Sequence, residues 1–224
     1  MQRFRVEQAQ LEYLALFANP QFALWGRGGE IMGGLFNAFR PFGVTLADFA
    51  SEDAGSGPGS SAVTVAFGWQ ARLRWRLDRI EATLVDTSAE GLSKFGHILR
   101  AADEWLRVSQ EGFQVAHHIA TYSSHLSLVS STAKDYLIGL GGLELESLGQ
   151  SMGTGVICHS FEPRKEWRLT FHLDTSVRVT DGLFNQFVVL ANSDKLDHHS
   201  AIAEGASLLR EALAEVGLEL LGEE

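Results

Sequence analysis

The alternation of apolar and polar positions in one short stretch of the chain occurs a second time. Residues 73–78 read LRWRLD, and residues 169–174 read LTFHLD. In each copy an aromatic side chain lies between two leucines, and an aspartate ends the run. Alternation with a period of two is typical of a β-strand that buries one face. We therefore predict that the two stretches are the central strands of two related halves.

The hydrophobic pattern predicts the same order of elements in each half: strand, helix, loop, hairpin and helix. In the first half the predicted elements are a strand at 8–17, a helix at 30–39, a Gly/Ser-rich loop at 51–61, paired strands at 62–69 and 72–85, and an amphipathic helix at 89–108. In the second half they are a long strand or a bulged pair of strands at 113–129, a helix at 132–140, a loop that ends near residue 155, paired strands at 156–161 and 167–177, an added strand at 183–191, and a final helix at 197–216.

This order predicts an α+β fold made of two related βαββα units. The units would span residues 1–110 and 111–224. They would form a mainly antiparallel sheet with the helices packed on one face. We expect the two units to pack together as one globular body.

Four further features describe this layout. They are an acidic residue in the first strand (Glu7 or Glu12), an arginine-rich strand that runs into Asp78-Arg79-Ile80, a helix containing Trp105, and a strand ending in Leu173-Asp174 before a final amphipathic helix. In these features the chain resembles a sporadically distributed family of bacterial proteins, over most of its length. The Arg-Tyr-hydrophobic-Asn motif that we associate with the family's second-half strand is replaced by Ala116-His117-His118-Ile119. The resemblance implies the same fold and brings no established activity with it.

Composition and charge narrow the classes of partner. The chain has 224 residues, of which 45% are hydrophobic and 21% charged, as in folded globular proteins. Its formal net charge of -10 disfavours binding to nucleic acid or to anionic membranes. The single cysteine cannot form a disulfide within the chain. The N-terminus lacks the apolar core of a signal peptide, and no apolar run reaches the roughly 18 residues of a membrane span. We therefore expect a soluble cytoplasmic protein without nucleic-acid or membrane partners.

Three arginines, Arg72, Arg74 and Arg76, alternate with apolar residues in the predicted strand at 72–85. Their side chains would line one face over about 14 Å, opposite the face that packs on the helices. Guanidinium groups pair well with carboxylates and phosphates, so this stripe is the candidate surface for a protein partner. Four other roles remain open: pairing with carboxylates across the sheet, exposure to solvent, protection of a sheet edge, and stacking on Trp69.

The histidines give a second candidate site. His117 and His118 are neighbours on a predicted strand, so their side chains point to opposite faces. Neither an HExxH motif nor the spacing of a structural zinc site is present. A cleft between the halves could bring together His118, His159, His172 and Arg76, which would suit a small ligand or an enzyme. Most of the eight histidines are nevertheless expected at the surface or in ordinary hydrogen bonds.

No arrangement typical of a catalytic centre is found elsewhere in the sequence. Cys158 and His159 are strand neighbours that face apart, so Cys158 is expected to be a small buried side chain. Asp103 and Glu104 lie on the flank of a predicted helix and are expected to be solvated. No GxSxG motif occurs. We therefore predict no catalytic residue, no metal site and no cofactor.

Two functions follow from these observations. The first is a non-catalytic interaction or assembly protein, such as a homo-oligomer or an accessory subunit of a bacterial complex, whose partner is another protein or a second copy. The alternative is a small-ligand-binding protein or enzyme with the histidine-containing cleft between the halves. The absence of any catalytic motif in the sequence favours the first function.

Overall fold

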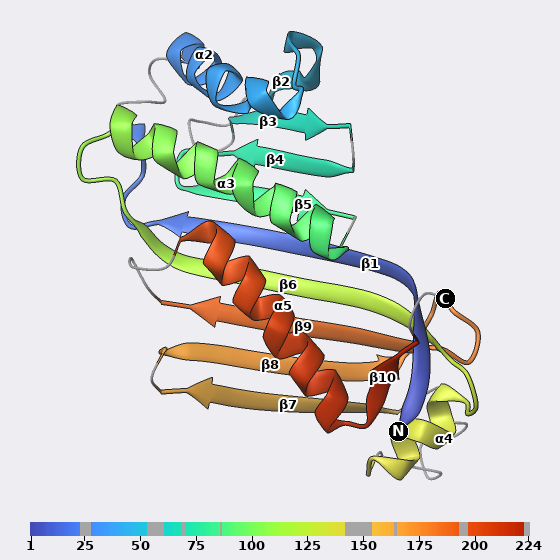
Figure 1. The fold of residues 1–224 in the computed structure, drawn as a ribbon. Helices are drawn as coiled ribbons and strands as arrows, with labels where there is room; N and C mark the ends of the chain where they lie inside the picture. Colours follow the sequence, from blue (N-terminus) through green and yellow to red (C-terminus); the bar gives the residue numbers. More distant parts are fainter. Residues whose placement is uncertain are drawn as a thin grey trace. The chain divides into compact units, whose positions relative to one another are not determined.

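The computed structural model describes the stretches 1–22, 28–52, 61–68, 70–85, 87–141, 154–163, 165–192 and 197–221. Over these residues the protein has the predicted α+β fold, with mainly antiparallel strands in one sheet (Figure 1). No helix among them is both long enough and apolar enough to cross a bilayer. The predicted loops at 51–61 and before residue 155 lie mostly outside the described residues.

The described residues form ten strands and four α-helices. The strands are β1 (Gln2–Phe17), β2 (Phe49–Glu52), β3 (Ala62–Phe67), β4 (Ala71–Trp75), β5 (Arg79–Leu84), β6 (Val115–Leu128), β7 (Gly155–Glu162), β8 (Trp167–Thr175), β9 (Leu183–Ala191) and β10 (Leu218–Leu220). The helices are α2 (Gly28–Phe39), α3 (Ala89–Ser109), α4 (Ala133–Gly139) and α5 (His198–Glu215), with short 3-10 helices η1 (Arg40–Phe42) and η2 (Leu46–Asp48). The strands are hydrogen-bonded in the order β2-β3-β4-β5-β1-β6-β9-β8-β7, and β10 pairs in parallel with the start of β1.

The chain divides into two compact units that are interleaved along the sequence. The β2–β5 unit comprises Leu11–Ala120 and Leu190–Glu204. The β7–β9 unit comprises Met1–Gln10, Thr121–Val189 and Gly205–Glu224. Strands β1, β6 and β9 and helix α5 contribute residues to both units. The duplication of two related halves, at 1–110 and 111–224, stays a prediction.

Alternating burial builds the core of the β2–β5 unit. Leu73 and Trp75 of β4 are fully buried, while the arginines beside them are more exposed. Helix α3 crosses the buried face (Figure 1), and its Trp105 ring meets Trp75 edge-on with 5.3 Å between the ring centroids. Gly34 of α2 lies so close to Trp105 that a Cβ on this glycine would come within 2.2 Å of the indole Nε1. Aromatic packing therefore sets how closely α2 approaches α3.

The prediction of one strand at 72–85 is wrong, because this stretch forms the two antiparallel strands β4 and β5. A tight turn joins them, closed by a 2.8 Å hydrogen bond that the Arg76 amide donates to the Arg79 carbonyl. Of the turn residues Arg76, Leu77 and Asp78, only Asp78 is of a type that favours turns, so the sequence gives little turn signal. The strand at 183–191, which was predicted as an added strand, therefore has a counterpart in β5. Each of the two follows a hairpin in the chain and comes before a long helix.

The predicted hairpin of the β7–β9 unit is present as β7 and β8. These strands pair antiparallel from Gly155 opposite Asp174 to Glu162 opposite Trp167. The later part of α5 crosses β9 and β8 (Figure 1). In the part of the chain that the structure describes, β7 is the last strand of the hydrogen-bonded order, and its outer edge has no neighbouring strand.

Candidate functional site

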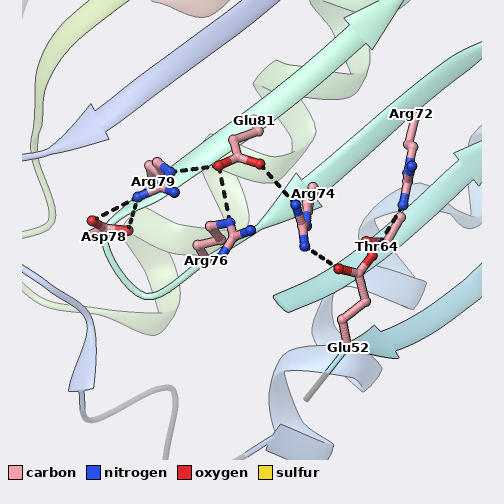
Figure 2. A network of polar contacts seen from close by, with 8 residues as sticks. All are labelled: Glu52, Thr64, Arg72, Arg74, Arg76, Asp78, Arg79 and Glu81. Carbon is pink, nitrogen blue, oxygen red and sulfur yellow. Dashed lines mark hydrogen bonds and ion pairs between the residues drawn. The ribbon is translucent and has the colours of Figure 1, made fainter. Parts of the chain in front are cut away.

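The predicted arginine stripe is part of a network that we call the arginine ladder: Arg72, Arg74, Arg76 and Arg79 with Glu52, Asp78 and Glu81 (Figure 2). Glu52 of β2 accepts a hydrogen bond of 3.1 Å from Arg72 and another from Arg74. Glu81 of β5 lies 3.0 Å from Arg76 Nε and 2.7 Å from Arg79 Nε. The ladder therefore links side chains of β2, β4 and β5 on the face that points away from the core.

The carboxylates of the ladder are held in their ionised form. The hydrogen bond from the Thr64 hydroxyl is the largest cause that lowers the pKa of Glu52, and the charges of Arg74 and Arg72 add to it. Burial alone would raise the pKa of Glu81, but the hydrogen bond from Arg79 and the neighbouring arginine charges lower it below its ordinary value. The guanidinium groups thus already face anionic partners within the chain.

The ladder matches one of the roles left open by the sequence, pairing with carboxylates across the sheet. A carboxylate of another protein would have to displace Glu52 or Glu81 from the arginines, or bind the more exposed Arg72. The binding of a partner at Arg72, Arg74 and Arg76 therefore stays a prediction, and the observed contacts assign the ladder a stabilising role in the sheet.

A second polar cluster is buried between β1, β6, α3 and α5. The Tyr13 hydroxyl lies 2.5 Å from His118 Nδ1 and 2.7 Å from His198 Nδ1. On the far side of His198, its Nε2 lies 3.3 Å from Asp103 Oδ1. Arg107 donates a hydrogen bond of 2.7 Å to the other oxygen of Asp103. We call these five residues the tyrosine–histidine cluster.

Each member of the tyrosine–histidine cluster is positioned by a regular element. Tyr13 and His118 lie on the core-facing sides of β1 and β6, and both are 2% exposed. His198 is the first residue of α5, and Asp103 comes from α3. The expectation that Asp103 is solvated is wrong, because its side chain is buried. Burial raises the pKa of Asp103, but the close contact with His198 and the hydrogen bond from Arg107 lower it overall, so this carboxyl stays ionised.

The three histidines of the predicted ligand cleft have different surroundings. His118 is buried in the β2–β5 unit. His159 and His172 lie on β7 and β8, where His159 Nδ1 is 3.1 Å from the Thr170 hydroxyl and His172 Nε2 is 3.6 Å from Asp174. The strand register places His159 diagonally from His172 on one face, at the separation of about 7–8 Å typical of diagonal neighbours. The cleft between the halves stays a prediction.

The described residues contain no group of three or more His, Cys, Asp or Glu side chains arranged to hold a metal ion. A shallow depression lies on the β7–β8 hairpin. It is lined by His159, Ser160, Phe161, Arg168, Leu169 and Thr170. Its open shape gives a small ligand little enclosure.

The third candidate is the outer edge of β7. This strand is eight residues long, and most of its side chains are exposed. Ile157 is 60% exposed and Phe161 58% exposed. The expectation that Cys158 is buried is wrong, because its thiol is exposed at the middle of the strand. Residues 155–161 (GVICHSF) include no acidic or basic side chain other than one histidine.

Proteins usually protect such an edge with lysine, proline, a bulge or a very short strand. The opposite end of the sheet follows this rule, since β2 has four residues and its Glu52 is engaged in the arginine ladder. The described part of β7 has none of these protections. An unpaired row of backbone N–H and C=O groups with apolar neighbours is suited to accept another strand.

Comparisons with known proteins do not assign the chain to a family. No protein-family model matches the sequence, and no curated protein matches it. Among solved structures the chain is similar to Methanococcus jannaschii TBP, with 9% sequence identity and a TM-score of 0.25. The alignment covers 95% of this chain and 98% of that chain. A TM-score this low carries no argument about function.

Proposed function

We propose that the protein is a non-catalytic assembly protein that associates with a second copy of itself by extending its sheet at β7. The observation that supports this proposal is the eight-residue strand β7, which is exposed, carries no formal charge over residues 155–161, and has no strand beyond it among the described residues. Strand addition satisfies backbone donors and acceptors, and side chains on alternate positions supply the specificity. The proposal places the protein in the cytoplasm, where the exposed Cys158 would stay a thiol.

Symmetry allows a second copy to fit this edge. Two β7 strands that pair antiparallel about a two-fold axis perpendicular to the sheet keep every side chain on its own face. The register must therefore pair an even-numbered residue with an even-numbered one, or an odd-numbered residue with an odd-numbered one. With the axis at Cys158, residues 155–161 of the two copies pair. Phe161 then lies opposite Gly155 of the other copy.

Charge favours this occupant and this register. The protein is acidic, with a formal net charge of -10, so two copies repel each other, and a contact surface without charged side chains adds least to this repulsion. Residues 155–161 satisfy that condition. Glu162 lies outside the paired stretch when the axis is at Cys158, whereas an axis at His159 would pair Glu162 with Val156 of the other copy. Cross-strand pairs contribute roughly 0.2–1 kcal/mol each, so we expect an association that depends on concentration.

Light scattering after size-exclusion chromatography tests the proposal. We expect the 24.5 kDa wild-type chain, kept in reducing agent, to approach twice that mass as its concentration rises. The double variant Ile157→Lys, Phe161→Lys should remain a monomer, because it places two like charges at the paired edge. Val177→Lys is the matched control, since Val177 belongs to the same unit, is 96% exposed and lies outside β7.

A wild-type chain that stays monomeric at every concentration would contradict the proposal. So would a dimer that the double variant forms equally well, which would move the interface away from β7. Native mass spectrometry of the same peak adds a further outcome. A monomer that carries a stoichiometric small molecule would favour the alternative, a ligand-binding protein or enzyme.

A further inference from the structure

The Tyr13 hydroxyl is shared by two histidine nitrogens. His118 Nδ1 lies 2.5 Å from it and His198 Nδ1 lies 2.7 Å from it. A phenol has one proton, so the hydroxyl can donate to one of these nitrogens and must accept from the other. In each state of the tyrosine–histidine cluster, one of the two Nδ1 atoms therefore carries a proton and the other is bare.

Asp103 determines the proton on the far side of His198. The carboxyl is ionised, since the close contact with His198 and the hydrogen bond from Arg107 outweigh the effect of its burial on its pKa. An ionised carboxylate only accepts hydrogen bonds, so His198 Nε2, which is 3.3 Å away, carries a proton. Neutral His198 then has a bare Nδ1 and accepts from Tyr13. Tyr13 in turn accepts from the Nδ1–H of His118.

Uptake of a proton by His198 reverses both hydrogen bonds. Nδ1 of the imidazolium becomes a donor, so the Tyr13 oxygen accepts from it and the hydroxyl proton turns to His118. His118 Nδ1 must now be bare, which requires the other neutral tautomer, with the proton on Nε2. One proton taken up at His198 thus changes the tautomer of His118 on another strand.

We propose that the tyrosine–histidine cluster is a pH-responsive hydrogen-bond switch at the start of α5, in which protonation of His198 reverses the hydroxyl of Tyr13 and changes the tautomer of His118. This role is independent of the proposed assembly at β7. His198 begins α5, so the switch acts on the segment by which this helix is held in the β2–β5 unit.

His198 lies between two opposite charges. The ionised Asp103 is on one side, and the positive end of the α5 helix dipole is on the other. Arg107 of α3 neutralises part of the Asp103 charge. The other titratable or charged neighbours are Asp197 and His199 beside His198 on the chain, and Arg100 and His97 of α3, which face them.

The cluster accepts one proton and not two. The rings of His118 and His198 have centroids 5.2 Å apart, and both side chains are at most 2% exposed. Two imidazolium ions at this distance in a buried site would repel strongly. The neutral His118 therefore reports the state of His198 by its tautomer instead of by its own charge.

Nitrogen NMR of histidine-labelled wild-type protein tests the switch between about pH 8 and pH 5, the range in which histidine changes its charge. We expect His118 Nδ1 to pass from the protonated to the bare form with the same midpoint as the protonation of His198. His117 is the control, because it is the neighbour of His118 on β6 but bonds Asn192 at 2.8 Å instead of Tyr13. Its tautomer should not change together with that of His118.

The Tyr13→Phe variant removes the shared proton and should uncouple the two histidines, so that His118 no longer follows His198. If that variant does not fold, the wild-type titration still decides the question. A His118 tautomer that stays fixed across the pH range would overturn the switch. Conversion of both His118 and His198 to imidazolium would overturn it as well.

Discussion

Replacing Glu81 with glutamine removes the carboxylate at the centre of the arginine ladder. This carboxylate lies 2.7 Å from Arg79, 3.0 Å from Arg76 and 3.6 Å from Arg74, and its side chain is 32% exposed. Exposed ion pairs contribute about 0.2–1 kcal/mol, and breaking a fully buried pair costs about 3–5 kcal/mol. For two close contacts and one longer contact in a half-buried site, we expect a loss of about 2 kcal/mol. In a chain of this size, that loss lowers Tm by about 4–8 °C.

Circular dichroism melts at neutral pH and low salt measure this effect. Glu90→Gln is the matched control, because Glu90 pairs with Lys94 at 2.6 Å on the exposed surface of α3. Such a pair is worth about 0.3–0.5 kcal/mol, so the control should shift Tm by no more than about 2 °C. Equal shifts for Glu81→Gln and Glu90→Gln would refute the reasoning.

Acidification supplies a second check on the same variant. Folding lowers the pKa of Glu81, so its stabilising contribution is present above the ordinary carboxyl range and is lost as pH falls through the lowered folded value. The Tm difference between the wild type and Glu81→Gln should therefore shrink at low pH. A difference that grows on acidification would contradict the assigned sign.

Other predictions concern packing and a single hydrogen bond. Gly33→Ala should stabilise α2 by about 0.5–1 kcal/mol, because nothing lies within 4 Å of the new Cβ and alanine is the better helix former. Gly34→Ala should instead lower Tm by several degrees, because its Cβ would overlap Trp105. If thermal melts showed Tm shifts of the same sign for Gly33→Ala and Gly34→Ala, they would contradict this packing. Tyr136→Phe should cost about 1 kcal/mol, because the hydroxyl donates to the Val216 carbonyl, and an unchanged urea midpoint would argue against that bond.

The sequence predicted those elements whose apolar spacing is long and regular. The helix at 89–108 is present as α3, and the strand at 113–129 is present as β6. The four-residue β2 and three-residue β10 were missed because strands so short show hardly any periodicity. The beginning of β1 was missed for a different reason: residues 3–7 (RFRVE) do alternate between polar and apolar, but most of these side chains are exposed, so the stretch lacks the repeated apolar face of a half-buried strand.

The candidate sites were predicted less well than the fold. The alternation of Arg74 and Arg76 with apolar neighbours correctly gave the face of the stripe, but Glu52 and Glu81 lie on other strands whose pairing the sequence does not reveal. The tyrosine–histidine cluster joins four elements that are far apart in the chain. Its one local signal is Tyr13, which alternates with Leu11 and Ala15 on the apolar face of its strand, because a buried phenol requires a polar partner.

Hydrogen exchange of the backbone amides of β7, measured over a series of protein concentrations, tests the proposed self-association most directly. We expect the amides within residues 155–161 that face away from β8 to become protected as concentration rises, over the range in which light scattering detects the dimer. Amides of β2, at the other end of the strand order, should exchange at a constant rate. Amides of β7 that exchange rapidly at every concentration would contradict sheet extension, and protection confined to β4 would move the interface to the arginine ladder.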